Sequence, residues 1–112
     1  MQIEWQYEHL DHSDALQEFA EKKLDKIDRR WGDRITRMRI FVSDINANKG
    51  GVDKHCTMEA RVAGIDPVVA ETTAADIYDA VKGAVDKLSH ALEHAIDSRK
   101  EKRPDDQVPP LD

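Results

Sequence analysis

The most constraining feature of the sequence is an alternation of apolar and polar residues that returns in separate segments of the chain. In the first of these segments Ile3, Trp5 and Tyr7 alternate with polar residues, which is the period of a β-strand with one buried face. The expected strands are residues 2–8, 34–45 and 54–64, followed by a short fourth segment, VVAETTA, at residues 68–74. Strands with one apolar face need other elements to cover that face of their sheet.

Two further segments have the period of an amphipathic helix. The first runs from Ser13, a good N-cap residue, to Trp31 and is ended by Gly32. The second is expected from Ala74 or Ala75 to about Arg99, with an apolar stripe made of Ile77, Val81, Ala84, Val85, Leu88, Leu92, Ala95 and Ile96. The order β-α-β-β-β-α predicts an α+β fold, a four-stranded mixed sheet with two helices packed on one face. The first two strands can be parallel, and the others should form antiparallel hairpins.

The length of 112 residues suits one compact domain, which we expect at residues 1–100. Residues 101–112 contain three prolines and few apolar side chains, so we expect a flexible C-terminal tail. The chain lacks an apolar run of ~18 residues and a secretory signal, and its single cysteine cannot form an internal disulfide. These features predict a cytoplasmic protein.

The charge of the chain is unevenly distributed. Its formal net charge is −6, yet residues 20–39 hold eight Lys or Arg residues against four acids. The basic side chains of the two helices also form stripes: Lys22, Lys26, Arg29 and Arg30 on the first, and Lys87, His90 and His94 on the second. If the helices lie side by side, these stripes could flank one groove that binds RNA through its backbone and shape. The alternative is that both stripes are simply solvated helix faces.

Two clusters could support other chemistry. His55 and Cys56 are adjacent, but neighbours in a strand point to opposite faces, and Cys56 is in phase with the apolar side chains. We therefore expect a core cysteine and no nucleophile. His90 and His94 could reach one metal ion, but no convincing third ligand accompanies them. No cofactor motif is present, so we expect no enzyme activity, no cofactor and no small-molecule substrate.

The stretch SDINANKGGVDKHC, residues 43–56, connects the second and third expected strands. Its paired glycines can adopt the positive φ angles that a hairpin loop needs. We expect a long hairpin loop at one end of the sheet, where Lys49, Lys54 and His55 can reach toward RNA.

The element order and two sequence patterns together resemble the short ribosome hibernation-promoting factor and ribosome-associated inhibitor A family. One pattern is the basic helix ending EKKLDKIDRRW, and the more specific one is Asp76-Ile77-Tyr78, Ala80 and Asp86-Lys87-Leu88. The resemblance implies a fold similar to double-stranded-RNA-binding domains. It also implies binding to the small ribosomal subunit between head and body, where tRNA and mRNA would otherwise lie, so that the ribosome is held inactive during starvation or cold.

Residue by residue, Lys23, Lys26 and Arg29 match the basic positions of the family's first helix, and Lys87 matches that of the Asp-Lys-Leu motif. His90 and His94 stand where relatives usually have Arg or Lys. The resemblance thus implies a non-enzymatic stress factor whose partner is the small ribosomal subunit and its rRNA, with no membrane partner, acting as a monomer or weak dimer. The alternative is an RNA- or protein-interaction module of the same fold with a regulatory role away from the ribosome.

Overall fold

The computed structural model describes residues 1–45 and 53–97 and has the element order β-α-β-β-β-α. Its elements are β1 (Gln2–Glu8), α1 (Asp14–Trp31), β2 (Ile35–Asp44), β3 (Lys54–Val62), β4 (Val68–Ala74) and α2 (Ile77–Leu92), with a π-helical turn at Glu93–Asp97. The predicted order and fold class are confirmed. Lys49, the expected helix end at Arg99 and the expected tail lie outside the described residues.

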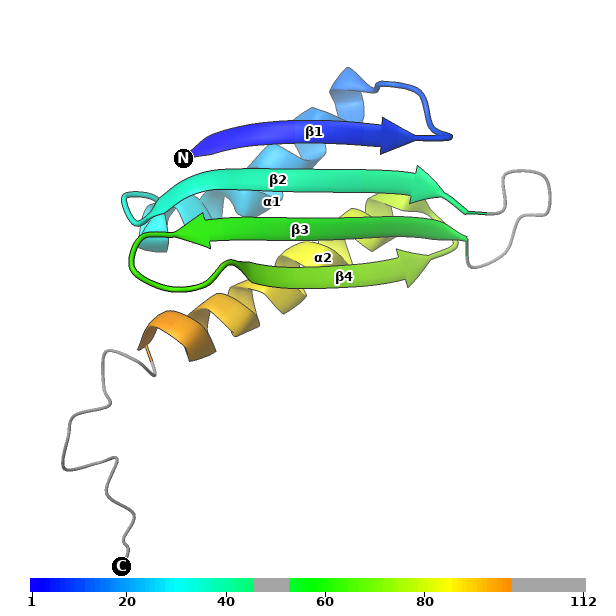
Figure 1. Ribbon diagram of the computed structural model, residues 1–112. Helices are drawn as coiled ribbons and strands as arrows, with labels where there is room; N and C mark the ends of the chain where they lie inside the picture. The colour runs from blue at the N-terminus through cyan, green and yellow to red at the C-terminus, as the bar shows by residue number, and fades with distance from the viewer. Residues whose placement is uncertain (46–52, 98–112) are drawn as a thin grey trace, which may run out of the picture.

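The four strands form one sheet in the order β1-β2-β3-β4. β1 and β2 are parallel, whereas the β2–β3 and β3–β4 pairs are antiparallel, as predicted. Both helices lie on the same side of this sheet, α1 behind β1 and β2, and α2 behind β3 and β4 (Figure 1). The opposite face is left uncovered by the described helices.

The core fills the space between the sheet and the two helices. The covered face of β2 contributes Met38, Ile40 and Val42, and α1 contributes Leu24 and Ile27, all of them fully buried. Alternation in the strands and the 3.6-residue period in the helices therefore predicted the buried faces correctly. β2 has the same alternation on its other side, where Arg37, Arg39 and Phe41 point away from the core.

The helix ends follow from side-chain caps. The Ser13 hydroxyl accepts a hydrogen bond from the Leu16 amide at 3.1 Å, which begins α1 where the sequence predicted. α2 begins later than predicted, because Ala74 is the last residue of β4 and the carboxylate of Asp76 caps the helix by accepting from the Tyr78 amide at 2.7 Å. Neither described helix is both long and apolar enough to span a membrane.

Candidate nucleic-acid interface

The exposed surface of α1 divides into a basic and an acidic flank. The basic flank, defined here as Lys22, Lys23, Lys26, Arg29 and Arg30, turns toward α2 and solvent. The acidic flank turns toward β1, where Asp28 lies 3.9 Å from the N-terminal amine and Glu21 and Asp25 border a shallow hollow beside Ile3. An acidic protein can therefore present a basic surface, because the two kinds of charge occupy different sides of one helix.

Three members of the basic flank are held by acids. The Lys26 ammonium lies 3.2 Å from Asp86 of α2, and Arg29 lies 2.7 Å from Asp25 within α1. Arg30 contacts Asp97 and lies 3.8 Å from Glu93, both beyond the C-terminus of α2 proper. Exposed pairs of this kind contribute only ~0.2–1 kcal/mol each, so an RNA phosphate can replace the acid at a small cost. Lys22 and Lys23 have no acidic partner within 4 Å among the residues that the structure describes.

The stripe of Lys87, His90 and His94 lies on a different flank of α2. The Lys87 ammonium donates a hydrogen bond at 3.2 Å to the backbone carbonyl of Glu71 in β4, which places this stripe on the β4 side of the helix. Asp86, whose partner is Lys26, lies on the α1 side. The two basic stripes therefore do not flank one groove, because acids of α2 stand between them.

An aromatic pair adjoins the basic flank. The rings of Phe19 in α1 and Tyr78 in α2 meet edge to face with centroids 5.0 Å apart, and the Lys23 ammonium lies 5.5 Å from the Phe19 centroid. Tyr78 is 37% exposed. Phe19 has the helical spacing of the apolar side of α1, but its ring is only partly buried. Exposed rings beside lysines can stack on unpaired bases while the lysines bind phosphate.

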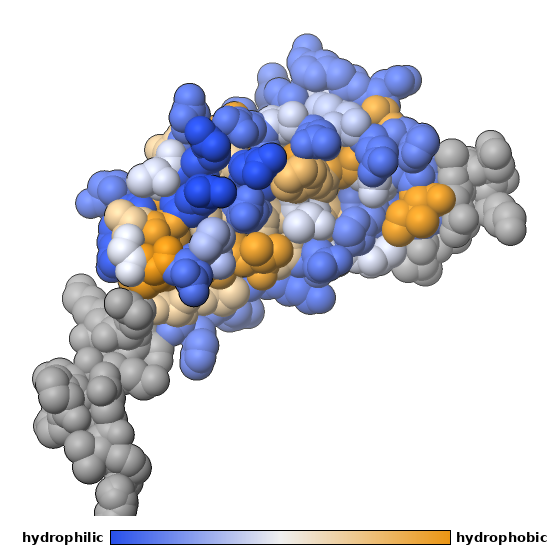
Figure 2. Space-filling model, in the orientation of Figure 1, coloured by the Kyte–Doolittle hydropathy of each residue, from blue (hydrophilic) through white to orange (hydrophobic). Residues whose placement is uncertain are grey.

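The uncovered face of the sheet carries further cations. Arg37 lies 3.5 Å from Glu4, and Arg39 lies between Glu4 at 3.7 Å and Glu59 at 3.6 Å. Arg61 stands directly opposite Arg37 in the β2–β3 register. Figure 2 shows this face as largely hydrophilic, with separate hydrophobic spots. Alternation along β2 and β3 places these three arginines on the uncovered face, and none of them is among the residues that the sequence predicted for RNA binding.

Comparison with known proteins decides the family. The family model described as "Sigma 54 modulation protein / S30EA ribosomal protein" matches residues 3–103. The chain belongs to this family. This confirms the resemblance inferred from the basic helix ending and the Asp-Lys-Leu pattern.

Individual relatives of this S30EA family member agree with that assignment. The chain is 29% identical over 114 residues to a ribosome hibernation promoting factor of Azotobacter vinelandii, covering 98% of this chain and 100% of that protein. Its structure is similar to the Protein Y N-terminal domain of Thermus thermophilus, with a TM-score of 0.69 and 26% identity. The match covers 85% of this chain and 99% of the other. A ribosomal subunit interface protein from Coxiella burnetii gives a TM-score of 0.67, 29% identity and coverage of 91% and 100%.

In this S30EA family member Lys54 is engaged at the base of the β2–β3 connection. Its ammonium lies 2.9 Å from Asp53, which is 1% exposed, and 3.4 Å from Asp44. The hydrogen bond with Asp53 raises the pKa of Lys54, and Asp44 acts in the same direction against partial desolvation. His55, a further residue expected to reach toward RNA, lies 2.8 Å from Glu71 on the uncovered face. The charge of Lys54 is therefore already balanced by two carboxylates inside the protein.

Cys56 is a core residue of this family member, as the alternation predicted. Its side chain is fully buried, and desolvation raises the pKa of the thiol to about 12. A thiol with such a pKa is not ionised at neutral pH, so it lacks the reactive form of a cysteine nucleophile. Within residues 1–45 and 53–97 no group of three His, Cys, Asp or Glu side chains is arranged to hold a metal ion.

Proposed function

We propose that this protein is a non-enzymatic ribosome-associated factor that binds the small ribosomal subunit and inhibits translation during dormancy. In this proposal the basic faces of α1 and α2 contact rRNA phosphates, and the bound domain blocks the sites of tRNA and mRNA. The support comes from the family, from the names of its relatives and from one structural observation. That observation is the basic flank of α1, where Lys23 adjoins the Phe19–Tyr78 pair and neither Lys22 nor Lys23 forms an ion pair among the described residues.

The proposed contacts differ in what binding must displace. Lys22, Lys23 and Lys87 need to break no ion pair with a described acid, whereas Lys26, Arg29 and Arg30 must exchange a carboxylate for a phosphate. His90 and His94 extend the stripe of Lys87 along α2. Each phosphate contact releases counterions, so the affinity should fall steeply with salt. We therefore expect Lys22, Lys23 and Lys87 to contribute more to affinity than the ion-paired residues Lys26, Arg29 and Arg30.

The second candidate function is an RNA- or protein-interaction module that acts away from the ribosome. The observation favouring it is the set of acids between the two basic stripes, Asp86, Glu93 and Asp97, in a chain of net charge −6. These carboxylates repel phosphate and reduce the field of the neighbouring cations. A compact protein partner with its own basic side chains would not meet this repulsion.

Co-sedimentation with purified small subunits and whole ribosomes, at low and high salt, tests the proposal. The wild-type protein should pellet with the small subunit at low salt and be released as salt rises. Lys22→Gln and Lys23→Gln together should weaken binding, while Arg34→Gln, an exposed cation in the turn before β2, serves as the control. Bound protein should also lower the occupancy of tRNA on the subunit. Absence from the pellet at low salt would reject the ribosomal function in favour of the second candidate.

We also expect the protein to act as a monomer or weak dimer. No described helix covers the outer face of the sheet, and the hydrophobic residues of that face are scattered instead of continuous (Figure 2). Stable homodimer interfaces are more apolar than the average protein surface. Sedimentation velocity over a range of protein concentrations measures this association directly, and a dimer that persists on dilution would contradict it.

A further inference from the structure

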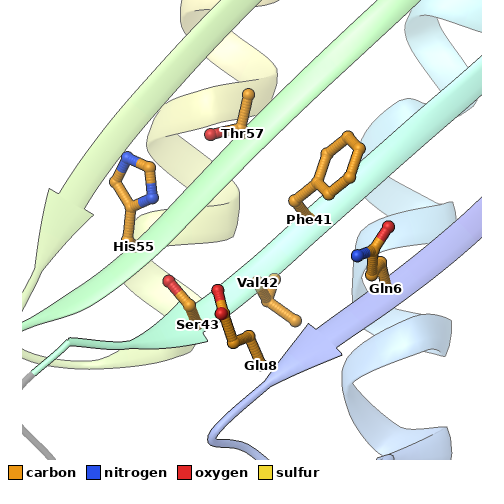
Figure 3. A pocket seen from close by; sticks show the side chains of 7 residues that line it. All are labelled: Gln6, Glu8, Phe41, Val42, Ser43, His55 and Thr57. Carbon is orange, nitrogen blue, oxygen red and sulfur yellow. The ribbon is translucent and has the colours of Figure 1, made fainter.

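A hollow lies on the uncovered face of the sheet, near the ends of β1 and β2. Its side chains form two rows across three strands: Gln6, Phe41 and Thr57 in one, and Glu8, Ser43 and His55 in the next. Figure 3 shows that the residues come from β1, β2 and β3 and surround the space above the sheet. The hollow exists because the central residue of its second row, Ser43, is small whereas its neighbours are large.

The size and lining of the hollow limit what can occupy it. Its volume of ≈ 310 Å³ is at the lower limit of the ~300–1,000 Å³ of small-molecule sites. Phe41 offers an aromatic ring, while Gln6, Glu8, Ser43 and His55 offer hydrogen-bonding groups around it. A flat ring with polar edges fits this combination, since one side can stack while the edge forms hydrogen bonds.

Cations beside the hollow can meet the phosphates of a nucleic acid strand, with Glu4 and Glu59 as the acids that Arg37 and Arg39 would exchange for phosphate. Arg39 precedes Phe41 by two residues on the same strand face, and its guanidinium lies 5.1 Å from the ring centroid. One step further along the sheet, Arg37 and Arg61 stand opposite each other. Like charges placed directly opposite destabilise a sheet, and Arg61 has no acidic partner within 4 Å in the described part of the chain. An anion between the two arginines would relieve that repulsion.

We propose that the uncovered sheet face is a second nucleic-acid surface that binds single-stranded RNA. One unstacked base occupies the hollow against Phe41, and the backbone runs along β2 so that phosphates meet Arg39, Arg37 and Arg61. Base–aromatic stacking on a four-stranded sheet is a general mode of recognition for unpaired RNA. The surface is separate from the helix faces of the proposed function, because the helices pack on the other side of the sheet (Figure 1).

The lining also determines a base preference. An ionised carboxylate only accepts hydrogen bonds, so Glu8 favours a base with an exocyclic amino group. Cytosine and adenine carry that group, whereas the ring N3–H of uracil lies between two carbonyl oxygens that Glu8 repels. The face should therefore bind cytosine-containing strands more tightly than uracil-containing ones.

The test uses the whole protein and two fluorescent RNA hexamers, all cytidine and all uridine, with affinities from anisotropy. The cytidine hexamer should bind the wild-type protein more tightly. Phe41→Leu keeps an apolar side chain but removes the ring, and should weaken binding at least about fivefold, the lower bound expected for one stacked base. Glu8→Gln should reduce the difference between the hexamers, because an amide also donates. Val69→Ala, at an exposed apolar residue outside the hollow, should bind like wild type.

A second measurement uses the wild-type protein and is independent of the folding of any variant. In the NMR spectrum of the wild-type protein, the cytidine hexamer should shift the amide signals of Ser43 and Thr57. Equal affinity for both hexamers, together with wild-type binding by Phe41→Leu, would overturn the proposal. Shifts of the Ser43 and Thr57 signals caused by ribosomal protein but not by RNA would also overturn it, because the face would then be a protein-binding surface.

The proposal rests on the proposed function only in taking the partner to be RNA, and the two can fail separately. Hexamer binding without co-sedimentation would leave the sheet surface intact and reject the ribosomal role. Co-sedimentation without hexamer binding would reject the sheet surface and leave the ribosomal role intact.

Discussion

Gly83 of α2 lies so close to Thr72 of β4 that a Cβ atom on Gly83 would stand 2.9 Å from Thr72 Cγ2. Real Cβ contacts are longer than this, so the glycine permits the close approach of the helix to the strand. Thr72 is β-branched and sits in a strand, where its side chain has few alternative rotamers. This contact fixes how near α2 can lie to β4, and hence where Lys87 meets the backbone of Glu71.

Gly83→Ala should therefore destabilise the protein, although alanine favours a helix over glycine by ~1 kcal/mol. Overpacking costs ~1–3 kcal/mol, so we expect a net loss of up to ~2 kcal/mol in urea unfolding. Thr72→Ala removes Cγ2 and a buried hydroxyl that has no hydrogen-bond partner among the described residues. In the double variant the alanine at 83 should cost less than it does alone. A Gly83→Ala protein more stable than wild type would show that a Cβ atom at residue 83 fits beside Thr72 without strain.

Cys56 should make stability depend on alkaline pH. Burial raises the thiol pKa from 9.0 to about 12, so between these values the unfolded chain loses the proton and the folded protein keeps it. The contribution is fully present below pH 9.0 and is lost as pH rises through about 12, by up to ~1.4 kcal/mol per pH unit. The free energy of unfolding of wild type relative to Cys56→Ala should thus fall from pH 8 to pH 10. A constant difference between the two proteins would contradict the burial of the thiol.

Lys54 should be needed for stability more than for RNA binding. Lys54→Gln leaves Asp53 buried without its cation, beside Asp44, so the variant should unfold at a lower urea concentration than wild type. Asp53→Asn in the same chain should restore part of the loss by removing the unpaired charge. A Lys54→Gln protein of wild-type stability but weaker ribosome binding would instead assign Lys54 to RNA.

Asp86→Asn should strengthen ribosome association by freeing the Lys26 ammonium and removing an acid from between the basic stripes. The expected gain at low salt is at most about fivefold, because an exposed pair contributes ~0.2–1 kcal/mol. Glu21→Gln makes the same change in net charge on the acidic flank of α1 and should have a smaller effect. Equal gains from both variants would show that only net charge matters and that the basic flank is not the contact surface.

Arg61→Glu should raise stability while it weakens hexamer binding. It replaces a like-charged cross-strand pair with Arg37 by an opposite-charged one, worth roughly 0.2–1 kcal/mol. The same change removes a proposed phosphate contact. Urea unfolding and anisotropy on one preparation measure both effects. Higher stability with unchanged hexamer affinity would exclude Arg61 from the RNA surface.

The sequence by itself determined which residues face the core. Alternation placed Cys56 and Met58 inward and Arg37 and Arg39 outward, and the Ser13 cap marked where α1 begins. These features depend on residues close together in the sequence, so the side-chain period of a helix or strand is enough to predict them. The order of the elements then left few ways to cover one face of a sheet with two helices.

Only the tertiary structure decided which side chains meet. Lys26 and Asp86 are 60 residues apart, and Arg30 and Asp97 are 67 apart, so spacing within α1 cannot show that its cations are held by α2. Likewise the hollow around Ser43 needs the register of three strands, because residues from each must stand side by side. The spacing of residues along a helix or strand determines only on which side of that element each side chain lies. The charge at a surface is set by the flank that packing turns toward a neighbour, and that depends on contacts between segments far apart in the chain.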